Sequence, residues 1–253
     1  MNERFNIENV AISITNLEQA VDDIIKKAES CEPAYVCVTN VRALYIGNHD
    51  TVYCRILNNS YLTVPDGKPL EWYAHITGLN NVKKTSGPDL FERICQLSES
   101  KEFTHFFYGS TPEIITKMKE NVLKKYPKLK IISAISPPFG SAQELANKEI
   151  IHQINTLKPT FVWIGLGAPK QEIFMDLIIN QIQSSLLIGI GLVFEYQAGT
   201  VIRAPKWMQN YGLEWLYRHI QQPKHINRKN YHRNFSIILL ILKAFFNKSR
   251  VKG

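Results

Sequence analysis

The segment 161–172, FVWIGLGAPKQE, combines residue types that can bind an anion. Its first four residues are aromatic, β-branched or aliphatic, which predicts a buried strand. A glycine-rich turn follows and ends in Pro169, which suits a first helical turn. Backbone N–H groups at a helix start can receive a phosphate, and the Gln171 side chain adds two donors and an acceptor. The segment therefore predicts an anion site, although an ordinary strand-to-helix turn would have the same pattern.

Three further polar residues follow apolar runs. Asp66 comes after 61–64 in the sequence VPDG, where a carboxylate can act as a general base or can cap the next helix. Thr39 and Asn40 come after 34–38, where their side chains can bind a hydroxyl of a sugar or nucleotide or, again, cap a helix. The local sequence leaves both roles open for all three.

The surrounding pattern alternates strands with helices and predicts an α/β fold, Rossmann-like, with a mostly parallel sheet and helices on both faces. Asn40, Asp66, Gly109, Gln171 and Gly191 all fall near strand ends, which meet at one edge of such a sheet, so we expect them to catalyse or to bind substrate. The expected strands are 34–38, 61–64, 104–108, 130–133, 161–164 and 185–190; the expected helices are 17–28, 41–46, 68–77, 90–97, 114–125 and 142–157, with another opening at 170.

Composition supports a large core and a reducing compartment. Hydrophobic residues make up 45% of the 253 residues, and the four cysteines show no C-x-x-C spacing. They are expected to be buried free thiols. The polar start MNERFNIENV shows no secretory signal, so we expect a cytoplasmic protein.

Positive charge is concentrated at the C-terminal end. Residues 203–253 contain eleven Lys or Arg and a single acid, Glu214. The net positive charge of this segment is therefore larger than the net charge of +8 of the whole chain. We therefore predict an α/β catalytic domain at 1–202 and a basic appendage at 203–253 that meets an anionic partner. The apolar run 235–246 is too short to cross a bilayer, but with its flanking cations it fits a peripheral helix on anionic lipid. A helix packed on the core or at an oligomer interface is the alternative.

Several kinds of binding site are excluded because the sequence lacks their motifs. The run Gly189-Ile190-Gly191 lacks the third glycine of a dinucleotide fingerprint, and there is no P-loop, no D-x-D pair and no histidine spacing typical of zinc. A bound diphosphate would therefore be met by Arg, Lys and backbone N–H groups. We expect no metal and no cofactor.

Five motifs in order carry a resemblance to a known family. They are PDGKPLEW at 65–72, SGPDL at 86–90, SPPF at 136–139, GLGAPKQE at 165–172 and AGTVIRAPKWMQNYGLEWLYR at 198–218. From about residue 5 to about residue 230 the chain resembles the WecG/TagA/CpsF glycosyltransferases, which include N-acetylmannosaminyltransferases of teichoic acid synthesis. The resemblance implies a metal-independent, inverting transfer from a UDP-sugar to a lipid-diphosphate-linked saccharide on the cytoplasmic membrane face.

The resemblance also implies roles for single residues. Asp66 matches the catalytic base, and Asn40 and Gln171 match polar residues of the active site. The family's threonine position is Val38 here, with Thr39 beside it as a second candidate. Cations expected at the substrate are Lys84, which stands where the family has arginine, together with Arg218, His225 and Arg228.

A different class of function is also compatible with the charge pattern. The chain could be an α/β module that binds phosphates or nucleic acid through its basic tail, with Tyr and Trp stacking on bases. The apolar run 237–242 has no use in that setting. We therefore expect a UDP-sugar, a lipid-linked acceptor and an anionic membrane as partners, and no nucleic acid; self-association is left open.

Overall fold

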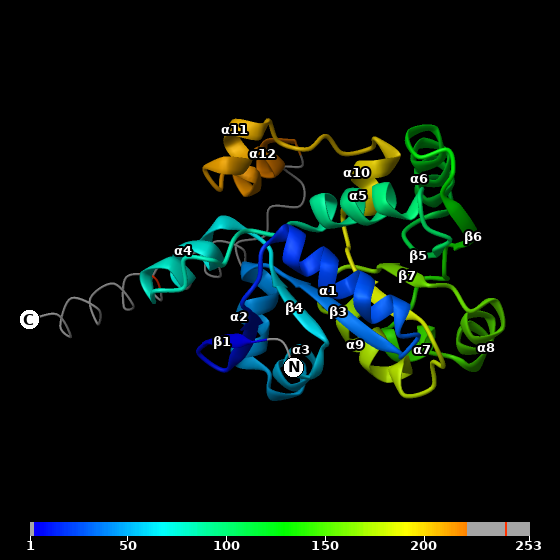
Figure 1. The fold of residues 1–253 in the computed structure, drawn as a ribbon, viewed down its shortest axis with the longest axis horizontal. Coiled ribbons are helices and arrows are strands. Elements are labelled where there is room, and N and C mark those ends of the chain that lie inside the picture. Colours follow the sequence, from blue (N-terminus) through cyan, green and yellow to red (C-terminus); the bar gives the residue numbers. More distant parts are fainter. Residues whose placement is uncertain (1–2, 222–240, 242–253) are drawn as a thin grey trace, which may run out of the picture.

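The computed structural model describes residues 3–221 and residue 241 (Figure 1). The predicted α/β class is confirmed: six parallel strands form one sheet in the order β4-β3-β8-β7-β5-β6, and helices cover both faces. The strands are β1 (Arg4–Ile7), β2 (Val10–Ser13), β3 (Ala34–Thr39), β4 (Leu62–Pro65), β5 (Thr104–Gly109), β6 (Lys130–Ile135), β7 (Phe161–Gly165) and β8 (Leu186–Gly189).

The helices, in chain order, are α1 (Leu17–Glu29), α2 (Val41–His49), α3 (Thr51–Asn59), α4 (Lys68–Ile76), α5 (Gly87–Ser98), α6 (Pro112–Lys125), α7 (Ala142–Leu145), α8 (Lys148–Leu157), α9 (Lys170–Ile179), α10 (Val193–Ala198), α11 (Lys206–Asn210) and α12 (Glu214–Gln221). Most expected elements are present with shifts of a few residues at their ends. α11 and α12 contact each other and lie at one end of the molecule near α4 and α5 (Figure 1).

Alternation along the strands divides the core into two clusters. Phe107 and Trp163 point to the face covered by α1, α5, α6 and α10, whereas Phe106 and Val162 point to the face covered by α2, α3, α8 and α9. Both faces of the sheet are thus buried, as a parallel sheet requires. Trp163 is fully buried, and its Nε1 donates a hydrogen bond of 2.9 Å to Nδ1 of His105.

An N-terminal hairpin of β1 and β2 was not predicted, because each strand has only four residues and little alternation. It packs its apolar side chains, Ile7, Val10 and Ile12, into the second core cluster. The Thr63 N–H of β4 donates to the Ser13 Oγ at 3.0 Å. The hairpin therefore covers the outer side of edge strand β4.

Two expectations were wrong in detail. The single helix at 142–157 is two helices, because the Asn147 side chain accepts hydrogen bonds from the N–H groups of Glu149 and Ile150 and so starts α8. The cysteines are free, but only Cys37 and Cys95 are buried; Cys31 is exposed and Cys54 is half-buried.

The C-terminal predictions fall largely beyond the described residues. Of the predicted membrane helix 235–246, only Ile241 is described, and it packs against the second core cluster. Within the described part of the chain, no helix has the length and apolar character needed to span a bilayer. The domain boundary near residue 203 stays a prediction.

Candidate active site

The carboxyl ends of β3, β4, β7 and β8 meet at one edge of the sheet. From β3 the chain moves outward to β4, and from β5 it moves outward in the opposite direction to β6, so the central strands β8 and β7 mark the reversal. A crevice outside the strand ends is expected at such a reversal. Thr39 pairs with Pro65 in the register of β3 and β4, which brings Asn40 and Asp66 side by side.

Asp66 lies at this edge with its side chain half-buried. Its N–H donates to the Thr39 carbonyl at 2.9 Å. Helix α4 begins after Gly67, which has a φ of 108°, and receives no side-chain cap, so the helix-cap role considered for Asp66 is not the one seen. Burial raises the pKa of the Asp66 carboxyl to about 6, against the lowering effect of Lys84 and with a further raising effect of Glu214.

Thr39 and Asn40 differ in how their polar atoms are used. The Asn40 Oδ1 caps α2 by accepting from the N–H groups of Arg42 at 3.0 Å and Ala43 at 3.1 Å. This leaves the Asn40 amide N–H₂ as the group that can face a ligand. Thr39 is fully buried, and its Oγ1 has no hydrogen-bond partner among the described residues.

Gln171 is buried and joins two loops of the crevice. Its Oε1 accepts from the Gly167 N–H at 3.2 Å, and its Nε2 donates to the Glu172 Oε1 at 2.8 Å. A Cβ at Gly191, where φ is 49°, would lie 3.4 Å from the Gln171 Oε1. Gln171 therefore supports the turn after β7 and lies against the loop after β8.

Gly109, at the end of β5, makes close backbone contact with β7. Its φ is 143°, and a Cβ there would lie only 2.5 Å from the Gly165 carbonyl oxygen. The next residue, Ser110, donates a hydrogen bond of 3.4 Å to the Glu195 Oε1. Burial raises the pKa of Glu195, whose Oε2 is buried without a partner among the described residues. This carboxylate oxygen is suited to accept a ligand hydroxyl.

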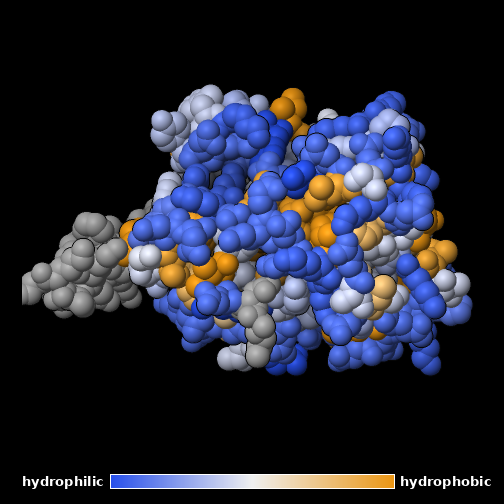
Figure 2. All heavy atoms as spheres, in the orientation of Figure 1, coloured by the Kyte–Doolittle hydropathy of each residue, from blue (hydrophilic) through white to orange (hydrophobic). Residues whose placement is uncertain are grey.

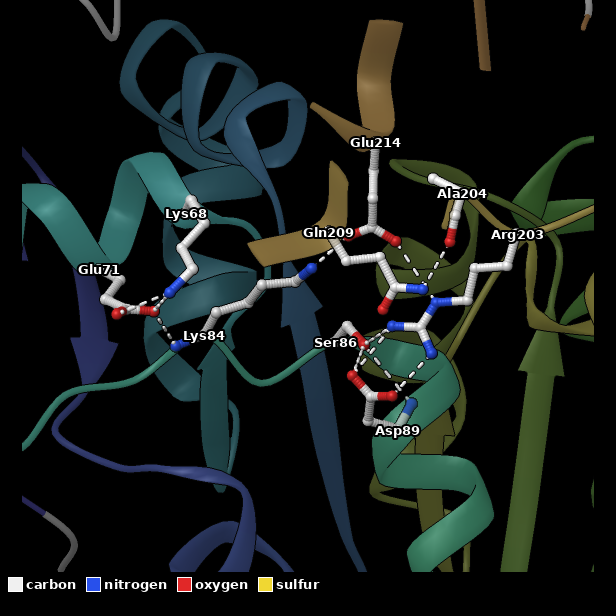
Figure 3. Close-up of polar contacts among 9 residues, drawn as sticks. All are labelled: Lys68, Glu71, Lys84, Ser86, Asp89, Arg203, Ala204, Gln209 and Glu214. Carbon is white, nitrogen blue, oxygen red and sulfur yellow. Dashed lines mark hydrogen bonds and ion pairs between the residues drawn. The ribbon is translucent and has the colours of Figure 1, made fainter. Parts of the chain in front are cut away.

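The charged residues that act on the pKa of Asp66 are joined to one another by ion pairs, which Figure 3 shows. Arg203 makes two parallel contacts with Asp89, Nη1 to Oδ1 at 2.6 Å and Nη2 to Oδ2 at 2.9 Å, and its Nε lies 3.3 Å from Glu214 Oε1. The other Glu214 oxygen pairs with the Lys84 ammonium. Although burial raises the pKa of Asp89, hydrogen bonds from Arg203 and Ser86 outweigh it and lower the pKa to about 2.

Glu71 extends this network along α4. Both of its oxygens lie 3.0 Å from the Lys68 Nζ, and its Oε2 accepts from the Lys84 N–H at 2.8 Å (Figure 3). The Lys84 side chain is only 10% exposed, so its charge is held close to Asp66.

The structure thus places the predicted residues in two groups and adds others. Asp66, Thr39, Asn40 and Lys84 lie on the side of β3 and β4, whereas Gly109, Gln171 and Gly191 lie on the side of β5, β7 and β8. Arg218 is exposed on α12, one turn after Glu214, and His225 and Arg228 are outside the described residues.

Sequence reasoning missed Glu71, Asp89, Arg203, Glu214 and Glu195 as members of the site. The first four lie inside motifs quoted above, and Glu214 is the single acid in a basic segment, which was a usable signal. Among the described residues, no group of three or more His, Cys, Asp or Glu is arranged to hold a metal ion.

Comparison with known proteins identifies relatives of this chain. An enzyme of Bacillus subtilis strain 168, N-acetylglucosaminyldiphosphoundecaprenol N-acetyl-beta-D-mannosaminyltransferase, is 27% identical over 218 residues, 86% of this chain and 83% of the relative. Enzymes of the same name from Bacillus spizizenii and Staphylococcus aureus strain MW2 are 24% and 22% identical, covering 75% and 98% of this chain and 72% and 95% of their own. The Glycosyl transferase WecG/TagA/CpsF family matches residues 5–251, and the chain therefore belongs to this family of glycosyltransferases.

Proposed function

We propose that this enzyme transfers N-acetylmannosamine or a related hexose from a UDP-sugar to a saccharide linked to undecaprenyl diphosphate. The names of the relatives support the acceptor class and the sugar. They also favour an enzyme over the phosphate- or nucleic-acid-binding module. The transfer is proposed to invert the anomeric centre and to need no metal.

The observation that carries the proposal is the half-buried Asp66 carboxyl at the crevice, whose pKa is raised to about 6. A base with a pKa just below the operating pH is ionised and still a good proton acceptor. In the proposed step, Asp66 takes the proton of an acceptor hydroxyl as that oxygen bonds to the anomeric carbon. The bond from this carbon to the phosphate oxygen breaks, and UDP leaves with the electron pair.

The leaving diphosphate needs positive charge, and cations of this chain can supply it. Lys84 lies within electrostatic range of Asp66, and Arg218 is exposed on the adjoining helix α12. Arg228 and His225 are proposed to join them, with backbone N–H groups of the turn after β7. Each preorganised donor of this kind contributes on the order of 3 kcal/mol to lowering the barrier.

We propose that the enzyme works peripherally at the cytoplasmic face of the membrane, where a lipid-linked acceptor would lie. The support is the basic and apolar composition of residues 222–253. Binding to vesicles of anionic lipid should weaken when residues 235–253 are removed, as measured by co-sedimentation. Equal binding of the shortened and full chains would contradict this assignment.

The central test replaces the proposed base. Asp66→Asn keeps the size of the side chain but cannot accept the proton, so sugar transfer should fall by about 10²–10⁴-fold. Transfer is measured with a short-chain lipid-diphosphate saccharide over a panel of UDP-sugars, and thermal unfolding checks that the fold is kept.

Asp22→Asn is the matched control, because it makes the same change at an exposed position on α1. Its transfer rate should equal that of the wild type. Near-normal turnover by Asp66→Asn would refute the role of Asp66 as the base.

A further inference from the structure

A groove lies beside α4, the helix that begins directly after Asp66 and Gly67. It has a volume of about 820 Å³ and lies between α4, the outer side of α5 and α11. Five of the residues drawn in Figure 3 line it: Lys68, Glu71, Lys84, Asp89 and Gln209. The face between α4 and α11 is mainly hydrophilic (Figure 2).

Most charges in the groove are already paired. Six cations and four carboxylates line it. Lys68 pairs with Glu71, Lys84 with Glu214, Arg93 with Glu18 and Lys125 with Glu92, and Asp89 is neutralised by Arg203. Two lysines of the lining, Lys83 and Lys206, have no ion-pair partner among the described residues.

These two lysines come from different segments of the groove lining, since Lys83 follows α4 and Lys206 begins α11. Lys83 lowers the pKa of Glu71 on α4, and Lys206 lowers the pKa of Asp89 on α5. Because these carboxylates are also paired with Lys68 and Arg203, the positive charge of Lys83 and Lys206 is available to a ligand. An anion with two negative groups can interact with both cations, whereas a neutral sugar offers neither of them a counter-charge.

We propose that Lys83 and Lys206 bind the diphosphate that joins the acceptor saccharide to its lipid. This assignment rests on the proposed function, because it takes a lipid-diphosphate-linked saccharide as the acceptor. It adds a subsite for that diphosphate next to the proposed donor site, because Lys84, proposed above for the donor diphosphate, also lines the groove.

The position of Asp66 indicates which side of the site the acceptor diphosphate occupies and which side the donor occupies. In an inverting displacement, the attacking oxygen and the leaving group lie on opposite sides of the anomeric carbon. The glycine turns at Gly167 and Gly191 follow β7 and β8 in the middle of the sheet, whereas Asp66 follows edge strand β4 and leads directly into α4. With donor phosphates at the central strands, the acceptor approaches from the α4 side, where the groove lies.

Aromatic side chains beside the groove suit the lipid end of such a molecule. Trp72 of α4 is 44% exposed, Trp207 of α11 is 58% exposed and Tyr211, the C-cap of α11, is 70% exposed. A Cβ at Gly212 would lie 2.9 Å from the Lys68 Cβ and 3.3 Å from the Trp72 ring, so α4 and the end of α11 touch there. Amphipathic rings at a polar groove are well placed to meet an isoprenoid and the membrane surface.

The test is direct binding, which does not depend on turnover. N-acetylglucosamine diphosphate carrying a short isoprenoid chain, and separately UDP, are titrated by calorimetry into the full-length wild type and into the double variant Lys83→Gln, Lys206→Gln. Affinity for the acceptor analogue should fall at least about tenfold, and affinity for UDP should be unchanged. An alkyl glycoside without the diphosphate should bind both proteins equally.

The control is the double variant Lys119→Gln, Lys148→Gln, which removes the same charge from exposed positions on α6 and α8. An equal loss in this control, an equal loss for UDP, or no loss for the acceptor analogue would overturn the assignment. A wild type that binds the analogue through the two lysines but transfers no sugar would contradict the proposed function and leave the subsite standing.

Discussion

At the scale of single residues, the site depends on one carboxyl group whose charged neighbours have opposite effects on its pKa. Burial and Glu214 raise the pKa of Asp66, whereas Lys84 and Arg203 lower it, and the result is about 6. A carboxylate with more cationic neighbours would have a lower pKa and would be a weaker base, and one with more acidic neighbours would stay protonated at neutral pH. The ion pairs around Asp66 therefore set its protonation as well as holding the loops.

The pH dependence of the reaction follows from this value. The base must be deprotonated, so kcat/KM should rise tenfold per pH unit below about pH 6 and level off above it. Initial rates between pH 4.5 and 8.5 check this, with unfolding monitored in parallel. A flat profile through pH 6 would argue against Asp66 as the base.

Substitutions of two charged neighbours of Asp66 should shift the pH–rate profile in opposite directions. Glu214→Gln removes a negative charge that raises the pKa of Asp66, so the midpoint should shift to lower pH. Lys84→Gln removes a positive charge that lowers it, so the midpoint should shift to higher pH. The same pH–rate series measures both, and shifts of equal sign would contradict the electrostatic account.

The position of Asp66 could be predicted from sequence because strand ends and turn residues are local signals. The Arg203–Asp89 pair could not, because 114 residues separate the partners and local patterns carry no information on contacts at that range. Gln171 was predicted to be a site residue, but its two hydrogen bonds to neighbouring groups depend on a turn conformation that composition does not specify.

At the scale of elements, the approach of β5 to β7 depends on Gly109. Gly109→Ala would place a methyl group 2.5 Å from a backbone oxygen that cannot move aside, at a φ that L-residues rarely adopt. We expect the free energy of unfolding to fall by at least about 3 kcal/mol in urea titrations.

Gly78→Ala separates the effect of a positive φ from the effect of a close contact with a neighbouring strand. Gly78 also has a positive φ, of 100°, but no atom lies within 4 Å of the position of its Cβ. Its cost should be limited to backbone strain, about 1 kcal/mol. Equal losses for the two variants would mean that contact with β7 is unimportant.

The helix predicted at 142–157 shows where periodicity fails. Its apolar spacing continues through residues 145–151, so the pattern alone supports one long helix. The break comes from the cap formed by Asn147, which competes with the helical hydrogen bonds at one residue. A cap inside an apolar pattern is a weaker signal than the pattern, and the boundary was therefore missed.

At the scale of the whole molecule, ion pairs join residues 203–221 to the α/β body. Asp89 has its pKa lowered to about 2, against an ordinary value of 3.8, so its contribution is present above about pH 4 and is lost as the pH falls toward 2. Asp89→Asn should lower the free energy of unfolding by about 2 kcal/mol at pH 7 and by much less at pH 2.5.

Chemical denaturation at the two pH values measures this difference, with Asp22→Asn as the exposed control. A loss that is the same at pH 7 and pH 2.5 would show that the Arg203–Asp89 charge pair is not its source. The sheet order itself was not predictable from the sequence, since alternating strands and helices are compatible with several orders.

The four tryptophans are distributed in a way that has a practical consequence. Trp163 is sealed in the core, whereas Trp72, Trp207 and Trp215 are exposed on α4, α11 and α12. Intrinsic fluorescence that a soluble quencher can reach therefore originates from α4, α11 and α12, and the shielded emission serves as an internal reference. Binding of a polyprenyl chain or a lipid surface at this end of the enzyme should change the intrinsic tryptophan fluorescence, so it can be measured without an attached dye.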